Sequence, residues 1–390
     1  MLGVRIDRWR VMCENRAMTA DDSRAVNDIG RRISQARQAM AMTQAELGHA
    51  IGLDRTAVGK LESGTRKVSA TELVALASAL DRPIDWFVVE SPPSVVSRRA
   101  DTIVGGRSPL LDRKIERLAR DVLFLIEQGI LADASERPAL EPPTDVSSAE
   151  ALAIEARQIM NVPDGPLCDL QRACENVGLM AFSLNLGEQG GDAACVEVEN
   201  MGAALINGVI DPGRRRFSLA HELGHHLFGD AYAPEVSISA MDDIERLINA
   251  FAIHLLLPRN AVSTLWDTAA DQDRRLAAVA VSVKFRASWS ATCSQLRTLG
   301  LIDADERERF NSTPPTAVDF IALGERWVPE MEAPSVPPEY GKRVLAAYQA
   351  GKLAAARTVE LLWDTVTIED LPEQRAIPLE ALRREFDPLS

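Results

Sequence analysis

The sequence predicts a mainly α-helical chain of two or more domains, with one small β-sheet near its middle. Three observations lead to this prediction. The chain has 390 residues, more than one ordinary hydrophobic core holds. Pro- and Gly-rich stretches at 91–108 and 135–145 divide it. Apolar residues follow a helical period through most of the chain, whereas 178–212 carries short apolar runs between Gly-rich turns, which is typical of strands.

The composition is that of a soluble globular protein, with 46% hydrophobic and 26% charged residues. No run of about 18 apolar residues is present, so we expect no membrane span. The first 20 residues are charged throughout and lack the apolar stretch of a secretion signal, so we expect a cytoplasmic protein. The five cysteines are scattered without a CxxC pair, which favours reduced thiols over disulfides or a cysteine zinc site.

The charge is distributed unevenly along the chain. The formal net charge is -14, which argues against a protein that coats nucleic acid over its whole surface. Residues 27–82 contain eight Lys or Arg and six Asp or Glu, a balance of +2, so the remainder carries -16. If the chain binds DNA, we expect the N-terminal segment to bind it.

The first third of the chain contains an arm and then a run of short helices. Residues 1–26 show no clean period, and we treat them as an arm that is free to be disordered. From 27 to 90, helical patterns follow one another with start signals in place. Thr43 with Glu46, and Ser69 with Glu72, fit the capping box, in which a hydroxyl and a carboxylate satisfy the free amides of a helix start.

Residues 91–145 are expected to be a linker that contains one connector helix. The apolar stripe of that helix consists of Leu111, Ile115, Leu118, Val122, Leu125 and Gly129. The stripe covers only about three heptads, which is short for a dimerisation helix. We therefore favour packing of this helix on the next domain, and a dimerisation helix is the alternative. Ser147 with Glu150 is then expected to cap a helix that runs to about Met160.

The strongest chemical signal is His221-Glu222-Leu223-Gly224-His225 within an amphipathic helical pattern. Positions four apart lie on one face of a helix, so both imidazoles can reach one zinc ion at about 2.0 to 2.1 Å. Glu222 projects beside them, where a carboxylate can accept a proton from the attacking water and deliver it to the leaving amine. A catalytic zinc needs a third protein ligand and one open position.

The third ligand is expected on the next helix, MDDIERLINAFAIHLLLP at 241–258. Glu245 and Asn249 lie one turn apart beside its apolar stripe, which suits a carboxylate ligand and a hydrogen bond from Asn249 to an imidazole. His254 is the alternative ligand, although it lies two and a half turns from Glu245. His49 belongs to the N-terminal helices, and His226 is rotated by about 100° from His225.

These motifs resemble the ImmA/IrrE family of metallopeptidases. RFSLAHELGHHLF, followed by Glu245, Asn249, Phe251-Ala252 and Leu255-Leu256-Leu257-Pro258, is similar to that family's pattern, with Ile248 standing where Ala is usual. The resemblance covers about 146–265 and extends more weakly through 273–312. It implies that His221, His225 and Glu245 bind zinc and that Glu222 is the base.

Two further features of this region each allow two interpretations. AALINGVI, at 203–210, is either the edge strand on which an extended substrate lies or a core strand. Cys195 is either a small buried apolar residue or a thiolate that plugs the open zinc position, and the first is the usual state of a lone cysteine.

The segment that begins at Ile29 resembles the XRE family of helix-turn-helix proteins. Its matching features are Thr43-Gln44-x-Glu46-Leu47-Gly48, a turn at Gly52, and Leu61-Glu62-Ser63-Gly64. The resemblance implies that the third helix, about 54–62, enters the major groove of DNA. The expected contacts are Arg55, Thr56 and Lys60, with Gln44 bridging to the backbone. A helical bundle used only for protein contact is the alternative.

Together these observations predict a mainly α protein: a five-helix XRE-type domain at 27–90, and an α+β zincin-like metallopeptidase domain at 146–265 with a small sheet. A second helix-turn-helix-like segment at 266–313 and a helical tail at 314–390 are expected to follow. The expected function is a DNA-binding regulator whose gluzincin-like endopeptidase, with one Zn2+ per chain, cleaves a regulatory protein encoded nearby, or itself. The alternative is a repressor that senses a ligand or metal without cleaving. We expect a homodimer on a double-stranded operator, because such domains usually bind paired half-sites.

Overall fold

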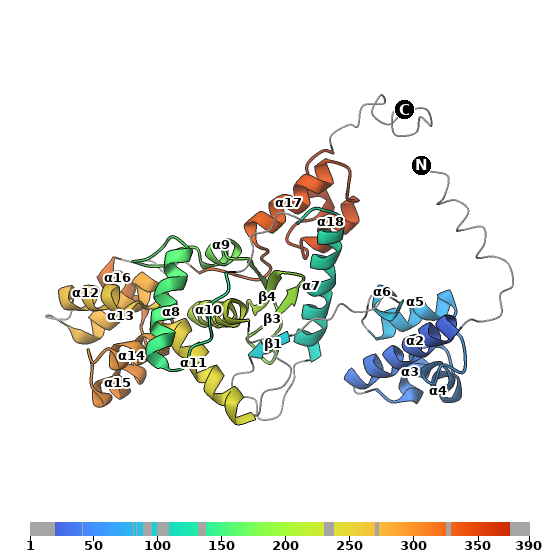
Figure 1. Ribbon diagram of the computed structural model, residues 1–390, viewed down its shortest axis with the longest axis horizontal. Helices are drawn as coiled ribbons and strands as arrows, with labels where there is room; N and C mark the ends of the chain where they lie inside the picture. The colour runs from blue at the N-terminus through green and yellow to red at the C-terminus, as the bar shows by residue number, and fades with distance from the viewer. Residues whose placement is uncertain are drawn as a thin grey trace. The chain divides into compact units, whose positions relative to one another are not determined.

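The computed structural model describes residues 20–40, 42–80, 82, 84–88, 96–99, 109–131, 138–229, 238–269, 273–324 and 329–374. The chain divides into two compact units, Met1–Ser91 and Pro92–Ser390. The described residues are mainly helical with one small sheet, which confirms the predicted fold class (Figure 1). Among them, no helix combines the length and the hydropathy needed to cross a bilayer.

The first unit is a bundle of short helices around a small apolar core. Its described helices are α2 (Ala20–Ala39), α3 (Gln44–Ile51), α4 (Arg55–Glu62), α5 (Ala70–Ala79) and α6 (Ile84–Val88). The helix α2 begins at Ala20, within the expected arm, and residues 1–19 of that arm lie outside the described residues. Ile33, Leu47, Val58 and Phe87 are among the buried core residues.

The capping boxes predicted for this unit are confirmed. Thr43 accepts from the Glu46 amide and Ser69 from the Glu72 amide, and both carboxylates bond back to the cap residue. Gly48 within α3 is needed for a different reason. A Cβ on Gly48 would lie 2.6 Å from the Leu53 carbonyl oxygen, so only glycine lets α3 approach the backbone of the turn that follows it so closely.

The second unit is built on a four-stranded sheet. Its strands are β1 (Val96–Arg99), β2 (Leu179–Leu184), β3 (Ala193–Val198) and β4 (Met201–Asn207), in the order β1-β3-β4-β2. β3 is antiparallel to both β1 and β4, and β2 is parallel to β4. β4 therefore lies inside the sheet. The suggestion that 203–210 is an edge strand for substrate is wrong, and the core-strand alternative is correct, because β2 and β3 already flank β4.

Helices cover both faces of this sheet (Figure 1). One face packs against α9 (Leu170–Glu175) and α10 (Pro212–Phe228), and α8 (Val146–Ile159) and α11 (Ile238–Leu256) extend the same apolar core beyond α10. The other face packs against α7 (Pro109–Glu127), and α17 (Pro338–Gln349) and α18 (Ala355–Leu361) share the core on that side. Alternate residues of β3 serve the two faces, with Cys195 toward α10 and Val196 toward α7.

The segment expected as a linker contributes both β1 and α7 to the second unit. The apolar stripe of α7 from Leu111 to Leu125 is buried against the sheet, as the connector interpretation predicts and the dimerisation alternative does not. The helix ends at Glu127, so Gly129 lies beyond the stripe, with φ +64. The cap of α8 is Asp145, with Ser148 at the third position, and the predicted pair of Ser147 and Glu150 is wrong by two residues.

The remaining helices follow α11 in the chain. They are α12 (Arg259–Ala269), α13 (Arg274–Phe285), α14 (Trp289–Thr298), α15 (Ala304–Asn311), α16 (Ala317–Leu323) and the short η3 (Ile368–Asp370). The tail completes the sheet layer: Tyr340 packs edge-on against Phe182 at 4.8 Å, and Ser335 forms a bridge with Ser183. Packing on the second unit is thus one role of the tail, which the sequence left open.

Candidate metal centre

The helix α10 is buried along most of its length, which the local sequence makes possible. Asp211 caps its start by accepting from the amides of Gly213 and Arg214, Pro212 occupies the first turn, and Gly229 ends the helix with φ +65. Its apolar residues pack between the sheet and α11. The predicted helix for the His221 and His225 pair is therefore present, inside the core rather than on a solvated face.

The close packing of α10 on α11 depends on Gly224. A Cβ at this position would lie 3.0 Å from Ile248 Cγ2 and 3.1 Å from Phe251 Cδ1, so a side chain would push the two helices apart. Ile248 is fully buried in this contact. Ile248 stands where the resembling family usually has Ala. Its larger side chain fits here because the residue that faces it on α10, Gly224, has no side chain.

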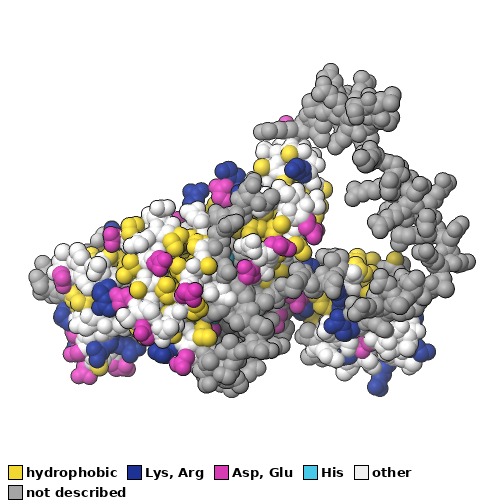
Figure 2. Space-filling model, viewed as in Figure 1, with side chains coloured by type: hydrophobic (Ala, Val, Ile, Leu, Met, Phe, Trp, Pro, Cys, Tyr) yellow, Lys and Arg dark blue, Asp and Glu magenta, His cyan; other side chains and the backbone are white. Residues whose placement is uncertain are grey.

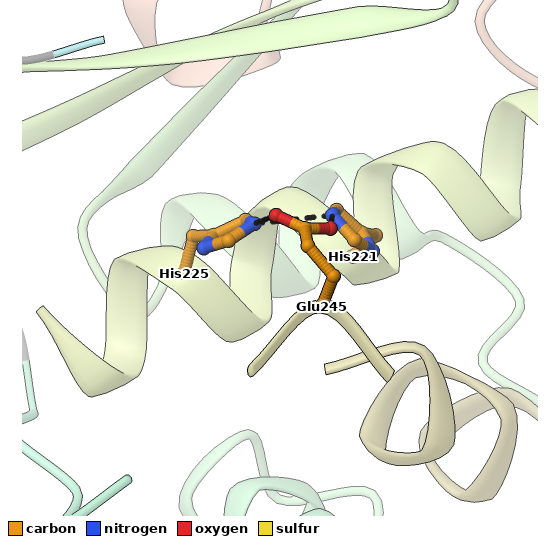
Figure 3. A group of neighbouring side chains, drawn as sticks. All are labelled: His221, His225 and Glu245. Carbon is orange, nitrogen blue, oxygen red and sulfur yellow. Dashed lines mark hydrogen bonds and ion pairs between the residues drawn. The ribbon is translucent and has the colours of Figure 1, made fainter. Parts of the chain in front are cut away.

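Three side chains from these two helices converge on one point (Figure 3). His221 Nε2 and His225 Nε2 lie 3.1 Å apart. The Glu245 carboxylate lies 3.2 Å from His221 Nε2 and 3.4 Å from His225 Nε2. Atoms that each bind one tetrahedral zinc ion at about 2.0 to 2.1 Å lie about 3.3 to 3.4 Å from one another, so the three observed separations fit a single ion.

Electrostatics favour the ionised form of the Glu245 carboxylate. Partial burial opposes ionisation, but hydrogen bonding with His221 and His225 outweighs burial and holds the pKa of Glu245 well below its usual range. Asn249, one turn further along α11, places its Oδ1 3.1 Å from His221 Nδ1. An acceptor at Nδ1 orients the ring, and when a metal ion is bound it would favour the tautomer with the proton on Nδ1, so that the Nε2 lone pair is available to the ion.

Glu222 is the fourth polar residue of this centre and is 0% exposed. Neither of its carboxylate oxygens has a hydrogen-bond partner of good geometry among the described residues. Burial raises the pKa of Glu222, and the two histidines and the Cys195 thiol on β3 act in the opposite direction. A buried carboxylate without a partner is costly, and an ion with its water beside the histidines would relieve that cost.

The other histidines do not belong to the centre. His226 Nε2 lies 3.0 Å from the Val177 carbonyl oxygen, and its ring fills the space above Gly202. His254, the alternative ligand, has its Nδ1 3.1 Å from Gln295 Nε2 and 3.8 Å from Glu150 Oε1. The structure therefore brings together Glu245, rather than His254, with the pair on α10. His49 lies in α3 of the first unit.

A cavity of about 740 Å³ begins one helical turn from the centre. Phe217, one turn before His221 on α10, lines it, and Ile253, one turn after Asn249 on α11, lines the facing wall. Its polar lining includes Arg214 and Arg307. Sequence reasoning missed both arginines, and the only available signal was the basic run at 214–216.

In the first unit, the residues expected to contact DNA divide into two groups. Arg55, Thr56 and Lys60 are exposed on α4. Gln44 is half-buried and donates from Nε2 to Glu62 Oε2 at 2.8 Å, and Glu62 also binds Arg37 at 2.6 Å. Gln44 thus joins an internal network of the helix-turn-helix, and the part played by Arg37 in that network was not predicted.

Comparisons with known proteins match two parts of the chain. A helix-turn-helix family model (HTH_3) matches residues 33–87. A peptidase model (Peptidase_M78), described as the IrrE N-terminal-like domain, matches residues 174–297. This chain belongs to the helix-turn-helix regulators and joins such a domain to an IrrE-like domain. The resemblance to the two families is thereby confirmed for the chain as a fusion.

The relatives of the helix-turn-helix domain are themselves described as transcriptional regulators. The chain is 34% identical over 74 residues to an uncharacterized transcriptional regulator in the ATPase CF(0) region of Rhodospirillum rubrum, a match that covers 18% of this chain and 68% of that protein. It is 38% identical over 69 residues to the uncharacterized HTH-type transcriptional regulator y4aM of Sinorhizobium fredii, covering 18% of this chain and 48% of that protein. The chain thus spans about half the length of the second relative.

Two solved structures are among those similar to this chain. The restriction-modification controller protein C.AhdI from Aeromonas hydrophila is 35% identical, with 16% of this chain and 94% of that chain covered and a TM-score of 0.16. PlcR of Bacillus thuringiensis, solved in complex with the peptide PapR7 and DNA, is 12% identical, with 76% and 96% of the two chains covered and a TM-score of 0.17.

Proposed function

We propose that the IrrE-like domain is a zinc endopeptidase, with one zinc ion held by His221, His225 and Glu245. The observation that carries this proposal is the convergence of the three donors at mutual distances of 3.1 to 3.4 Å. The buried Glu222 carboxylate lies in the same helix between the two histidines, and neither of its oxygens has a hydrogen-bond partner of good geometry in the described part of the chain. Nitrogen and oxygen donors in this set suit zinc, and three protein ligands leave a position open for water or substrate.

A bound zinc ion would polarise the scissile carbonyl and lower the pKa of the attacking water. The chain's own residues supply the remaining steps. Glu222 accepts a proton from the water and delivers it to the leaving amine nitrogen as the carbon–nitrogen bond breaks. The raised pKa of Glu222 suits both transfers, because the carboxyl group can hold the proton between them. Asn249 holds the His221 ring in its orientation.

The cavity beside the centre supplies a binding site for a side chain of the substrate. Its walls are aromatic and apolar at Phe217, Trp289 and Ile253. Such a lining suits an apolar side chain of the substrate, because burying that side chain removes apolar surface from water. The substrate we propose is a regulatory protein encoded near this chain.

The helix-turn-helix domain is proposed to bind a double-stranded operator as a homodimer, with α4 in the major groove. In support, Arg55, Thr56 and Lys60 are exposed on α4, and Thr56 and Lys60 lie four residues apart on one helical face. On the face shown in Figure 2, basic side chains project from this unit. Binding is tested by mobility shift on the promoter of its own operon, and affinity that does not fall with salt would contradict it.

The peptidase proposal is tested with the purified full chain. Elemental analysis should find one zinc per chain in the wild type and in Glu222→Gln, and much less in His225→Ala. Proteins encoded beside the chain are then incubated with the wild type, with Glu222→Gln, and with Glu188→Gln as a surface control. We expect cleavage by the wild type and the control only. Equal behaviour of Glu222→Gln and the wild type would contradict the proposal.

A further inference from the structure

The strand β1 comes from the segment that follows the helix-turn-helix unit, and it forms one edge of the sheet in the second unit. It pairs antiparallel with β3, with Val96 opposite Val196, Ser97 opposite Cys195, Arg98 opposite Ala194 and Arg99 opposite Ala193. We call Val96–Arg99 the linker strand. Only these four residues of the segment 89–108 are described.

The linker strand lies beside the strand that packs on the helix of the metal centre. Its partner β3 packs on α10, and the linker strand itself also contacts α10. Cys195, the residue paired with Ser97, is buried in the core that β3 shares with α10. The backbone of Ser97 therefore lies one strand away from a side chain that faces the helix of His221, Glu222 and His225.

The opposite edge of the sheet does not offer this position. β2 is separated from β3 by β4, and its Ser183 already pairs with Ser335 of the tail. An extended peptide binds a sheet by adding a strand to an edge, where main-chain hydrogen bonds supply affinity. The outer side of β3 is the edge position beside the strand that directs Cys195 toward α10, and the linker strand occupies it.

We propose that the linker strand is the endopeptidase's own substrate, bound in the position where any extended substrate would add to β3. This inference rests on the proposed peptidase function. Water adds its oxygen to the carbonyl carbon of a peptide bond at or next to Ser97, and the carbon–nitrogen bond breaks. Glu222 carries the proton from the water to the new amine. The products are a new carboxylate on the N-terminal fragment and a new amine on the C-terminal fragment, and no other reactant is needed.

The consequence is a regulator that severs itself. A cut at this strand separates the helix-turn-helix unit from most of the IrrE-like unit, because the strand begins at Val96, five positions after the last residue of the first unit. The tether also gives the strand an effective concentration that reaches the millimolar range for short linkers, so a free peptide has to compete with it. Uncut chain should therefore cleave other proteins slowly.

The first experiment incubates the full chain with zinc and follows it by intact-mass spectrometry. We expect two fragments whose masses sum to that of the chain plus one water, with the new ends at or next to Ser97. The first-order rate constant should not change with protein concentration, as a reaction within one chain requires. Glu222→Gln should stay intact. A fluorogenic peptide with the sequence SVVSRRADT serves as a separate substrate.

The second experiment uses proline variants of the strand. Alternate residues of an edge strand direct their N–H groups toward the neighbouring strand, and proline has none. One of Ser97→Pro and Arg98→Pro therefore removes a bond to β3, and the other is its matched control. In the variant that loses the bond to β3, we expect faster hydrogen exchange of the β3 amides at 193–198 when zinc is absent. With zinc bound, the same variant should cleave the free peptide at least severalfold faster than the control variant does.

The outcomes separate the two proposals. Linker cleavage that Glu222→Gln abolishes, with exposure of β3 in one proline variant, supports the inference. A second outcome is that the chain cleaves the free peptide while its linker stays intact and the β3 amides exchange equally in both proline variants. That outcome overturns the inference and leaves the peptidase proposal standing. Zinc-loaded protein that cleaves neither linker nor peptide contradicts both.

Discussion

Replacing Glu222 by Gln should change stability and activity in opposite directions. Both oxygens of this fully buried carboxylate lack a hydrogen-bond partner of good geometry among the described residues, and burial raises its pKa. An unsatisfied buried polar group costs about 1 to 3 kcal/mol, and more when it is charged. Gln keeps the shape and removes the charge. We expect the zinc-free variant to have a free energy of unfolding higher by about 1 to 3 kcal/mol.

The measurement is differential scanning calorimetry of the chelator-treated full chain, following the transition of the larger unit. At about 2 °C or more per kcal/mol for a unit of this size, the expected rise in Tm is about 2 to 6 °C. Proteolysis by the zinc-loaded variant should fall by about 10² to 10⁴-fold, because the proton transfer is lost. Glu188→Gln, an exposed site, should change stability by no more than about 0.5 kcal/mol.

A lower Tm for zinc-free Glu222→Gln would refute this reasoning. It would mean that the carboxylate is well satisfied within the folded chain, and that its burial reflects packing instead of readiness for an ion and its water. A stabilised variant that retained full proteolysis would refute the role of Glu222 as the base and leave the stability argument intact.

Three further predictions follow from other parts of the structure. Glu245→Gln should lose most bound zinc, and chelation should then lower its Tm less than that of the wild type, since a ligand stabilises only the state that binds it. Lys60→Ala should weaken operator binding and reduce the slope of log affinity against log salt by about one, as measured by salt titration. Tyr340→Ala should destabilise the second unit by about 3 to 5 kcal/mol in denaturant unfolding, because its ring packs on Phe182 within the sheet core.

The sequence alone determined the features that depend on short-range spacing. A spacing of four residues places His221 and His225 on one helical face wherever that helix packs, and the capping boxes at Thr43 and Ser69 depend only on residues three positions apart. The stripe of α7 likewise follows from a helical period. Glu245 was found because its helix carries its own apolar face, which limits the sides on which a ligand can lie.

Only the tertiary structure decided what joins distant segments. Strand order is one such feature: apolar runs predicted the strands, but nothing local shows that β4 is interior or that Val96–Arg99 completes the edge, because pairing partners are chosen by the whole sheet. The tail's place against β2 is another, since Tyr340 and Phe182 meet through burial of apolar surface, which is non-directional and leaves no spacing in the sequence. The isolation of Glu222 and the engagement of Gln44 with Glu62 also appear only in the fold, because hydrogen-bond satisfaction depends on every group that packs around a side chain.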